Sequence, residues 1–151
     1  MRSKFDSQLA TLSEEMTQMG ANCEEVIALA AKALLEGEAQ LGAKVADIDS
    51  KIDRMERDIE SLCFKLILQQ QPVAKDLRQI SAALKMITDL ERIGDQADDI
   101  AEIIPFLGGR TGAECESVSL MARETIRMVT ESVDAYVKGD VELAKAVIAH
   151  D

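Results

Sequence analysis

The segment 89–102 carries a run of carboxylates whose spacing is suited to binding a metal ion. Glu91 and Asp95 are four residues apart, and so are Asp95 and Asp99. Side chains four apart on a helix lie one turn apart on adjoining faces, and like charges at that spacing destabilise the helix by a few tenths of a kcal/mol per pair. A hard multivalent cation bound by oxygen ligands would offset this repulsion.

A second acidic pair of the same spacing, Asp49 and Asp53, flanks the apolar seam of another predicted helix. In a chain with 28 acidic residues, such clusters are also typical of a plain solvated face. Two features favour a site over that alternative. The acids continue the apolar register that runs from Val73 to Ile87, and Gly94 lies between them, although a glycine inside a helix costs about 1 kcal/mol relative to alanine.

The elements that carry these acids are long amphipathic helices. Apolar residues recur every three or four positions in the predicted helices 3–36, 38–70 and 72–105, and two further helices are expected at 113–138 and 140–151. The second helix has a strict heptad seam, which predicts near-antiparallel packing against its neighbours. Gly37 is expected to end the first helix and Pro72 to begin the third. No strand pattern is present in the sequence, so the expected fold is all-α.

The chain contains an internal repeat. Aligning 32–49 with 134–151 at an offset of 102 gives five identities, which are Ala33/Ala135, Gly37/Gly139, Leu41/Leu143, Val45/Val147 and Asp49/Asp151. The match of Gly37 with Gly139, each of which is expected to end a helix, is harder to obtain by chance than the apolar matches. We therefore expect one complete three-helix repeat in 1–107 and the first part of a second, truncated repeat in 113–151.

Composition excludes several classes of function. A net charge of -11 with no basic stripe argues against binding nucleic acid. No signal peptide and no apolar run of membrane-spanning length is visible, and the three cysteines have no metal-site spacing, so a soluble cytoplasmic protein is expected. A di-iron enzyme needs Glu-x-x-His pairs, whereas His150 is the single histidine. No glycine-rich phosphate cradle is present either.

The segment from Leu68 to Glu102 closely resembles the PhoU family of regulators of bacterial phosphate uptake and signalling. The resemblance is carried by Leu68-Gln-Gln-Gln-Pro-Val-Ala-Lys-Asp-Leu77, Ala82-Ala-Leu-Lys-Met-Ile-Thr-Asp89 and Asp89-Leu-Glu-Arg-Ile-Gly-Asp95. The glycine breaks and the duplicated layout fit as well, so the resemblance extends over essentially the whole chain. It implies tandem antiparallel three-helix bundles and no enzymatic activity.

The resemblance also implies that acid-x-x-x-Asp motifs bind clusters of metal ions on the helix surface. In this sequence these motifs are Asp49-Ser-Lys-Ile-Asp53 and Glu91-Arg-Ile-Gly-Asp95, with Asp95-Gln-Ala-Asp-Asp99 as a weaker third. Iron or zinc follows from the resemblance, whereas magnesium or calcium follows from oxygen ligands alone.

The partners implied by the resemblance are the phosphate ABC transporter and the phosphate sensor histidine kinase, which such a protein restrains when phosphate is ample. Peripheral contact with the inner membrane, bridged by metal, is also implied. This sequence departs from the family pattern because it ends two helices early. We therefore expect the apolar residues of the last two helices to pack against a second copy, giving a homodimer. The alternative function is a structural dimerising helical bundle without a functional metal site.

Overall fold

The computed structural model describes residues 2–111 and 116–151, with the side chains of Arg2 and Gln70 left aside. The elements are α1 (Arg2–Glu36), α2 (Leu41–Gln70), α3 (Ala74–Ile103), the 3-10 helix η1 (Ile104–Leu107), α4 (Glu116–Lys138) and α5 (Val141–His150). These ranges contain no β-strand, and the predicted all-α fold is confirmed.

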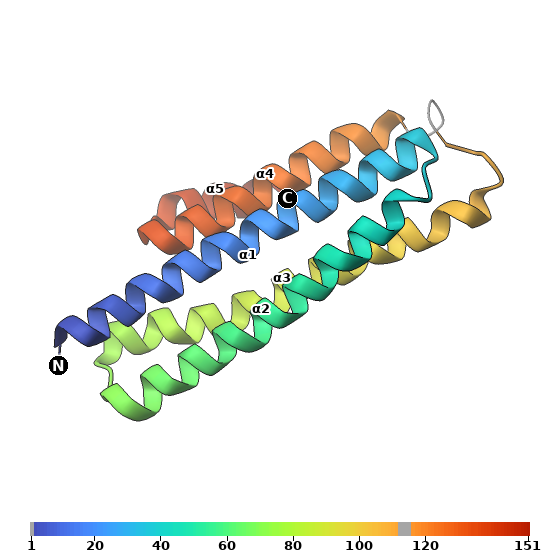
Figure 1. Cartoon of the computed structure of the whole chain (residues 1–151). Helices are drawn as coiled ribbons and strands as arrows, with labels where there is room; N and C mark the ends of the chain where they lie inside the picture. Colours follow the sequence, from blue (N-terminus) through green and yellow to red (C-terminus); the bar gives the residue numbers. More distant parts are fainter. Residues whose placement is uncertain (1, 112–115) are drawn as a thin grey trace.

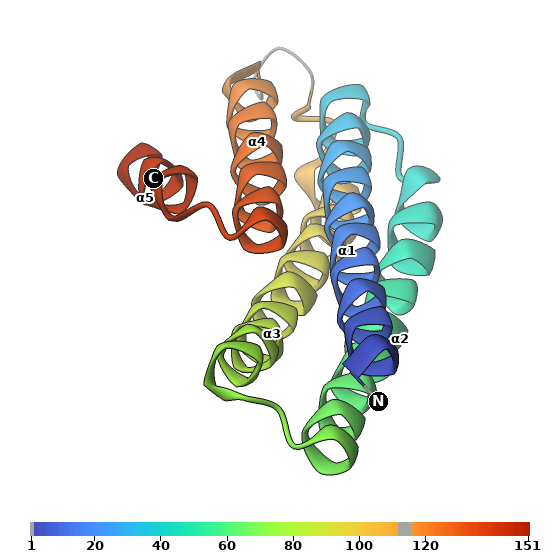
Figure 2. The same cartoon turned by 90° about the vertical axis from the view of Figure 1, so that its left-hand side faces the viewer.

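Helices α1, α2 and α3 form an antiparallel three-helix bundle, and α4 lies along α1 on the side away from α2 (Figures 1 and 2). The short helix α5 turns back from the end of α4 and packs against it. The bundle core is aliphatic and methionine-rich, and its largest fully buried side chains include Leu12, Met16, Met19, Ile52, Ile59, Leu66 and Ile80. The strict heptad seam of α2 therefore faces this core, as the sequence predicted.

The helix ends follow local backbone chemistry. Helix α1 ends where Gly37 adopts a left-handed conformation with φ of 68°, which confirms its predicted role. Helix α3 begins at Ala74, two residues after the predicted start, because the backbone is left-handed at Gln71 and extended at Val73. Asp140 caps α5 by accepting a hydrogen bond from the Leu143 backbone N–H. Cys115 and the predicted start of the fourth helix at 113 lie outside the described residues.

One expectation about the second half of the chain was partly wrong. Val129, Val133 and Val147 are buried within this chain, because α4 packs on α1 and α5 folds onto α4. At the α1–α4 contact, a Cβ on Gly20 would come within 2.9 Å of Val133 Cγ2. Met121, in contrast, is 65% exposed. The division into 1–107 and 113–151 stays a prediction.

The predicted apolar seam of α3 is confirmed in its middle and wrong at its start. Ile80 and Ile87 are buried as expected, whereas Val73 is 56% exposed and Leu77 is 44% exposed. The buried positions of the helix are Asp76, Ile80, Ala83, Ile87, Leu90, Gly94, Ala97 and Ala101. Gly94 thus faces the core, and the acids on either side of it lie at the edge of the buried stripe.

Candidate metal centre

Three aspartates from two helices meet at the packed interface between α2 and α3. Asp49 and Asp53 lie one turn apart on α2, and Asp95 lies on α3. One carboxylate oxygen from each residue lies within 4.8 Å of those of the other two. Asp49 and Asp53 are half-buried and Asp95 is exposed, so the cluster opens to solvent on the α3 side.

Gly94 makes the close approach of the two helices possible at this cluster. A Cβ at this position would lie 2.8 Å from Asp49 Oδ1 and 3.1 Å from Ile52 Cδ1. Both distances are shorter than ordinary van der Waals contact. The glycine inside the helix is therefore explained by the position of the Asp49 carboxylate and not by a need for backbone flexibility.

Two carboxylate oxygens of the cluster lack a hydrogen-bond partner among the described residues. Asp49 Oδ1 and Asp53 Oδ1 are both shielded from solvent and unpaired. A buried acceptor without a partner is unfavourable, and a buried carboxylate is more so. Oxygen donors of this kind fit a hard or borderline cation, so the residues present are compatible with a bound metal ion.

Burial, hydrogen bonding and neighbouring charges raise the pKa values of Asp49 and Glu91 in the site. Burial, followed by the charges of Asp95 and Asp53, raises the pKa of Asp49 to about 7. The hydrogen bond that Glu91 shares with Asp95, with burial as the next cause, raises the pKa of Glu91 to about 7. Each of these groups would be stabilised in its charged form by a cation.

The structure brings most of the predicted metal ligands together but leaves one outside the cluster. Asp49, Asp53 and Asp95 come together, and Glu91 lies beside them through its hydrogen bond with Asp95. Asp99 is exposed and lies outside the cluster.

Two acids omitted from the predicted ligand set adjoin the cluster. The pKa values of Glu56 and Asp98 are raised, first by burial and then by neighbouring carboxylates. Their spacing carried a signal, because Glu56 is seven residues after Asp49, and Asp98 is seven after Glu91 and three after Asp95.

The raised pKa values predict an unusual pH dependence for the metal-free protein. Asp49 and Glu91 have ordinary pKa values of 3.8 and 4.5, and both are raised to about 7 in the folded state. The folded state therefore binds protons more tightly than the unfolded state, and stability is gained as the pH falls through 7. We expect Tm to rise by a few degrees between about pH 8 and pH 6 in the presence of a chelator. A thermal melt that is flat or falls over this interval would contradict the prediction.

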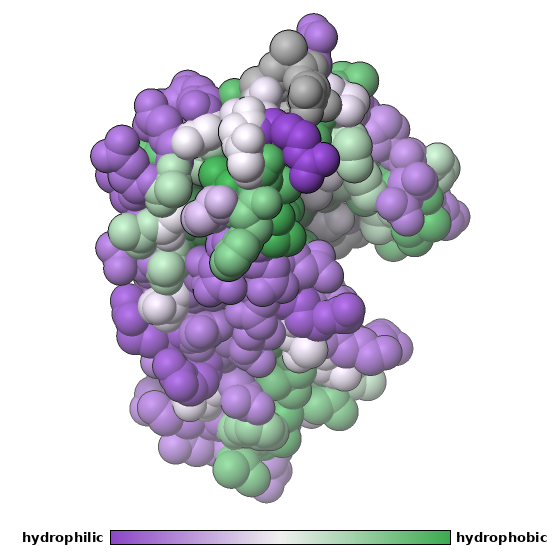
Figure 3. All heavy atoms as spheres, turned by 90° about the vertical axis from the view of Figure 1, so that its right-hand side faces the viewer, coloured by the Kyte–Doolittle hydropathy of each residue, from purple (hydrophilic) through white to green (hydrophobic). Residues whose placement is uncertain are grey.

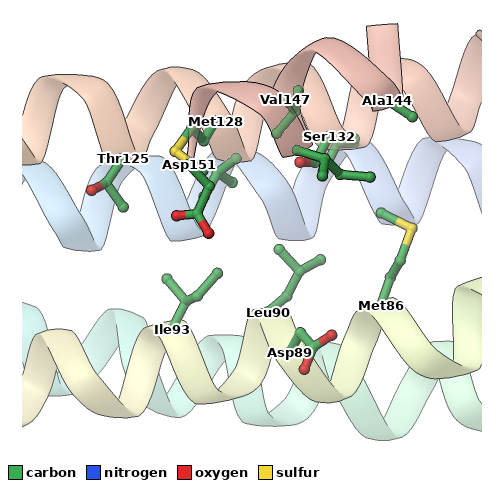
Figure 4. A pocket seen from close by; sticks show the side chains of 13 residues that line it. Met86, Asp89, Leu90, Ile93, Thr125, Met128, Ser132, Ala144, Val147 and Asp151 are labelled. Atoms are coloured by element: carbon green, nitrogen blue, oxygen red, sulfur yellow. The ribbon is translucent and has the colours of Figure 1, made fainter. Parts of the chain in front are cut away.

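A separate apolar cavity of about 500 Å³ lies between α3 on one side and α4 with α5 on the other. Figure 4 shows Leu90, Ile93 and Met86 of α3 pointing toward Met128 and Val147 across this space. Asp89 and Asp151 are the acids in its lining. The cavity has no cluster of metal-binding groups among the described residues, so it is distinct from the metal centre.

Comparison with known proteins gives a family match over most of the chain. Residues 16–104 match the model of the PhoU domain. The chain is 36% identical to a phosphate-specific transport system accessory protein PhoU homolog of Clostridium acetobutylicum, with 99% of this chain and 69% of that relative covered. It is 35% identical to a homolog of the same name from Synechocystis, with 87% of this chain and 59% of that relative covered.

Solved structures agree with the sequence comparison. The crystal structure of PhoU from Pseudomonas aeruginosa matches with a TM-score of 0.90 and 32% identity, over 97% of this chain and 71% of that one. PhoU from Streptococcus pneumoniae matches with a TM-score of 0.86 at 24% identity, which supports the fold alone. The chain therefore spans about 60–70% of the length of these relatives.

Proposed function

Because this chain belongs to the PhoU family, we propose that it is a negative regulator of phosphate uptake and of phosphate-responsive two-component signalling. Its relatives are named accessory proteins of the phosphate-specific transport system. In this proposal the chain is a cytoplasmic helical adaptor without catalytic activity, and its acidic cluster binds the metal that organises its contact surface. Residues 1–107 form the first repeat and 113–151 the first part of the second.

The observation that carries the metal-dependent part is the carboxylate cluster between α2 and α3. A solvated acidic face would place its carboxylates in water, whereas here Asp49 and Asp53 each hold a shielded oxygen with no hydrogen-bond partner. Gly94 leaves the space that the Asp49 carboxylate occupies. The site is thus shaped around these oxygens, which supports Asp49, Asp53 and Asp95 as ligands, with Glu91 as a further one.

Elemental analysis tests this proposal directly. Protein purified without chelator or affinity metal should contain at least one metal ion per chain, with iron or zinc expected from the family and magnesium or calcium from the oxygen ligands. A variant with asparagine at Asp49, Asp53 and Asp95 should lose it. Metal content that is substoichiometric and unchanged in the variant would leave the acids as solubilising surface.

The regulatory part is tested in cells. The proposed partners are the phosphate ABC transporter and the phosphate sensor histidine kinase, and the proposal includes peripheral contact with the inner membrane. In cells that lack their own family member, this chain should reduce phosphate uptake and reporter expression from a phosphate-starvation promoter when phosphate is ample. Unchanged uptake and expression, with the protein present at normal levels, would contradict the proposal.

The apolar surface around α4 and α5 supports a second candidate function, a dimerising bundle without a metal role. The cavity between α3, α4 and α5 is lined mostly by apolar groups, and Leu120, Met121 and Ile148 are each more than half exposed. Exposed apolar surface of this kind favours association. Light scattering at micromolar concentration should show a dimer, and a monomer would argue against this role. A dimer whose mass is insensitive to chelator, in a protein that binds no metal, would favour it.

A further inference from the structure

The end of the molecule that faces the viewer in Figure 2 is formed by three chain features. They are the N-terminal end of α1, the turn between α2 and α3, and the turn between α4 and α5 (Figures 1 and 2). The α2–α3 turn and the α4–α5 turn border one shallow hollow, because Lys75, Arg78, Lys138 and Val141 all line it. These segments, far apart in sequence, therefore form one continuous surface.

This surface is basic in an otherwise acidic protein. The chain has a net charge of -11, yet residues 61–78 contain Lys65, Lys75 and Arg78 against one acid, Asp76, which is buried. Lys138 adds a fourth exposed cation across the hollow. No salt bridge joins any of these four cations to a described acid.

Two acids lie at the α4–α5 turn, and Asp140 is among the residues that line the hollow. Asp140 accepts a hydrogen bond from the Leu143 backbone N–H as the cap of α5. Glu142 forms a salt bridge with Lys145 at 3.2 Å. Asp140 keeps its negative charge, whereas that of Glu142 is offset by Lys145. The four cations therefore outnumber the acids Asp76 and Asp140, and the surface carries a net positive charge.

Exposed apolar side chains belong to the same two turns as these cations. Leu68 is 80% exposed and Val73 is 56% exposed on either side of the α2–α3 turn, and Val141 is 63% exposed at the α4–α5 turn. Because these side chains come from two different turns, the surface that touches them all is broad and not a slot for one chain. Exposed aliphatic groups combined with lysine and arginine on the same end match the interface of an anionic bilayer, where the apolar groups enter the headgroup region and the cations pair with lipid phosphates.

The opposite end of the molecule provides an internal comparison. Apolar atoms also gather there (Figure 3), and Phe106 is 85% exposed and Ile103 is 51% exposed. The acids Asp98, Asp99 and Glu102 precede these residues on α3. Exposed apolar groups therefore occur at both ends, but at this opposite end the exposed acids Asp99 and Glu102 lie next to them in the chain.

We propose that the surface formed by Lys65, Lys75, Arg78 and Lys138 with Leu68 and Val73 docks on an anionic lipid membrane. This basic end is built from the α2–α3 and α4–α5 turns, whereas the metal centre lies farther along α2 and α3. The inference deepens the membrane contact in the proposed function by naming its surface and chemistry, and it rests on the proposed function only for the existence of that contact. It requires no metal.

Vesicle flotation tests the proposal. The full chain, with chelator present, is mixed with vesicles of phosphatidylcholine alone or with about 30% phosphatidylglycerol, an anionic lipid. We expect binding to the anionic vesicles only, and binding should weaken as salt rises from about 0.1 M to about 0.5 M. The variant Lys65→Glu, Lys75→Glu, Arg78→Glu should lower the partition coefficient on the order of a hundredfold, since each basic residue near a surface contributes about a factor of five or more.

Matched variants test whether vesicle binding depends on the basic end itself. They distinguish this from an effect of net charge or of exposed apolar surface elsewhere on the molecule. Lys32→Glu, Lys44→Glu, Lys51→Glu changes the net charge equally at exposed positions elsewhere and should leave the fold and most of the binding intact. Leu68→Ser, Val73→Ser should reduce binding about tenfold, whereas Ile103→Ser, Phe106→Ser at the other end should not. Circular dichroism confirms that each variant is folded.

Each outcome of this experiment decides the proposal. Loss of vesicle binding in the basic-end variants, with binding retained in the matched ones, supports it whether or not the protein binds metal. No binding to anionic vesicles overturns it. So does binding that survives in the basic-end variants or that appears only after metal is added. Binding to soluble polyglutamate without binding to vesicles would assign the surface to an acidic protein instead.

Discussion

Replacing Asp49, Asp53 and Asp95 together with asparagine should make the metal-free protein more stable and abolish its stabilisation by metal. At pH 8 the three carboxylates are held within 4.8 Å of one another, and the pKa of Asp49 is raised to about 7. Removing this repulsion should raise the free energy of unfolding by about 1–2 kcal/mol after allowance for solvent screening. A free metal concentration of about a hundred times Kd should raise the free energy of unfolding of the wild-type protein by about 2.7 kcal/mol. The same metal concentration should leave that of the variant unchanged.

The measurement is thermal or urea unfolding of both proteins at pH 8, with chelator and then with each metal. A matched control is the variant Asp47→Asn, Asp58→Asn, Asp99→Asn, which changes net charge equally at exposed positions outside the cluster. Its metal-dependent stabilisation should equal that of the wild-type protein. A cluster variant that is less stable than the wild-type protein in chelator would show that these acids stabilise the fold, and the proposed site would then be wrong.

Replacing Gly94 with alanine should damage metal binding far more than it damages the fold. The new Cβ would lie 2.8 Å from Asp49 Oδ1 and 3.1 Å from Ile52 Cδ1, and both atoms are the ends of side chains that can move. Overpacking of this kind costs about 1–3 kcal/mol, against which the helix gains about 1 kcal/mol from losing a glycine. The free energy of unfolding should thus fall by no more than about 2 kcal/mol, whereas metal affinity should fall at least about tenfold because Asp49 is displaced.

Gly42→Ala is the matched control for this substitution. Its Cβ would meet only Ala101 Cβ, at an ordinary 4.0 Å, so the variant should gain up to about 1 kcal/mol of stability and bind metal normally. Isothermal titration with the metal found by elemental analysis, paired with urea unfolding, measures both quantities. Unchanged metal affinity in Gly94→Ala would mean that the Asp49 carboxylate is not a ligand in the position seen here.

Much of the fold could be predicted from the sequence because its signals are local and periodic. The seam of α2, from Val45 to Leu66, repeats with heptad spacing, and these residues form the core as expected. The glycine break at Gly37 ends α1 with the predicted left-handed conformation. Helix starts were less accurate, since the first turns of α2 and α3 depend on the conformation of loop residues such as Gln71, which periodicity does not encode.

The packing of α4 could not be predicted in the same way. Its apolar face was expected to require a second copy, yet α4 packs on α1 beside Gly20, where the absence of a side chain makes room for Val133. An amphipathic pattern states that a face will be buried but does not name the surface that buries it. Contacts between elements far apart in sequence are decided by shape.

The sequence by itself determined the helices and the acidic pairs at four-residue spacing. It also indicated a close contact at Gly94, because a glycine inside a helix is otherwise unfavourable. Only the tertiary structure decided which acids meet. Asp49 and Asp53 of α2 face Asp95 of α3 because the two helices pack against each other at Gly94, and this geometry leaves Asp99 outside and brings Glu56 and Asp98 near. Spacing along one helix fixes a face, but the distance between carboxylates on two helices depends on how closely their backbones approach.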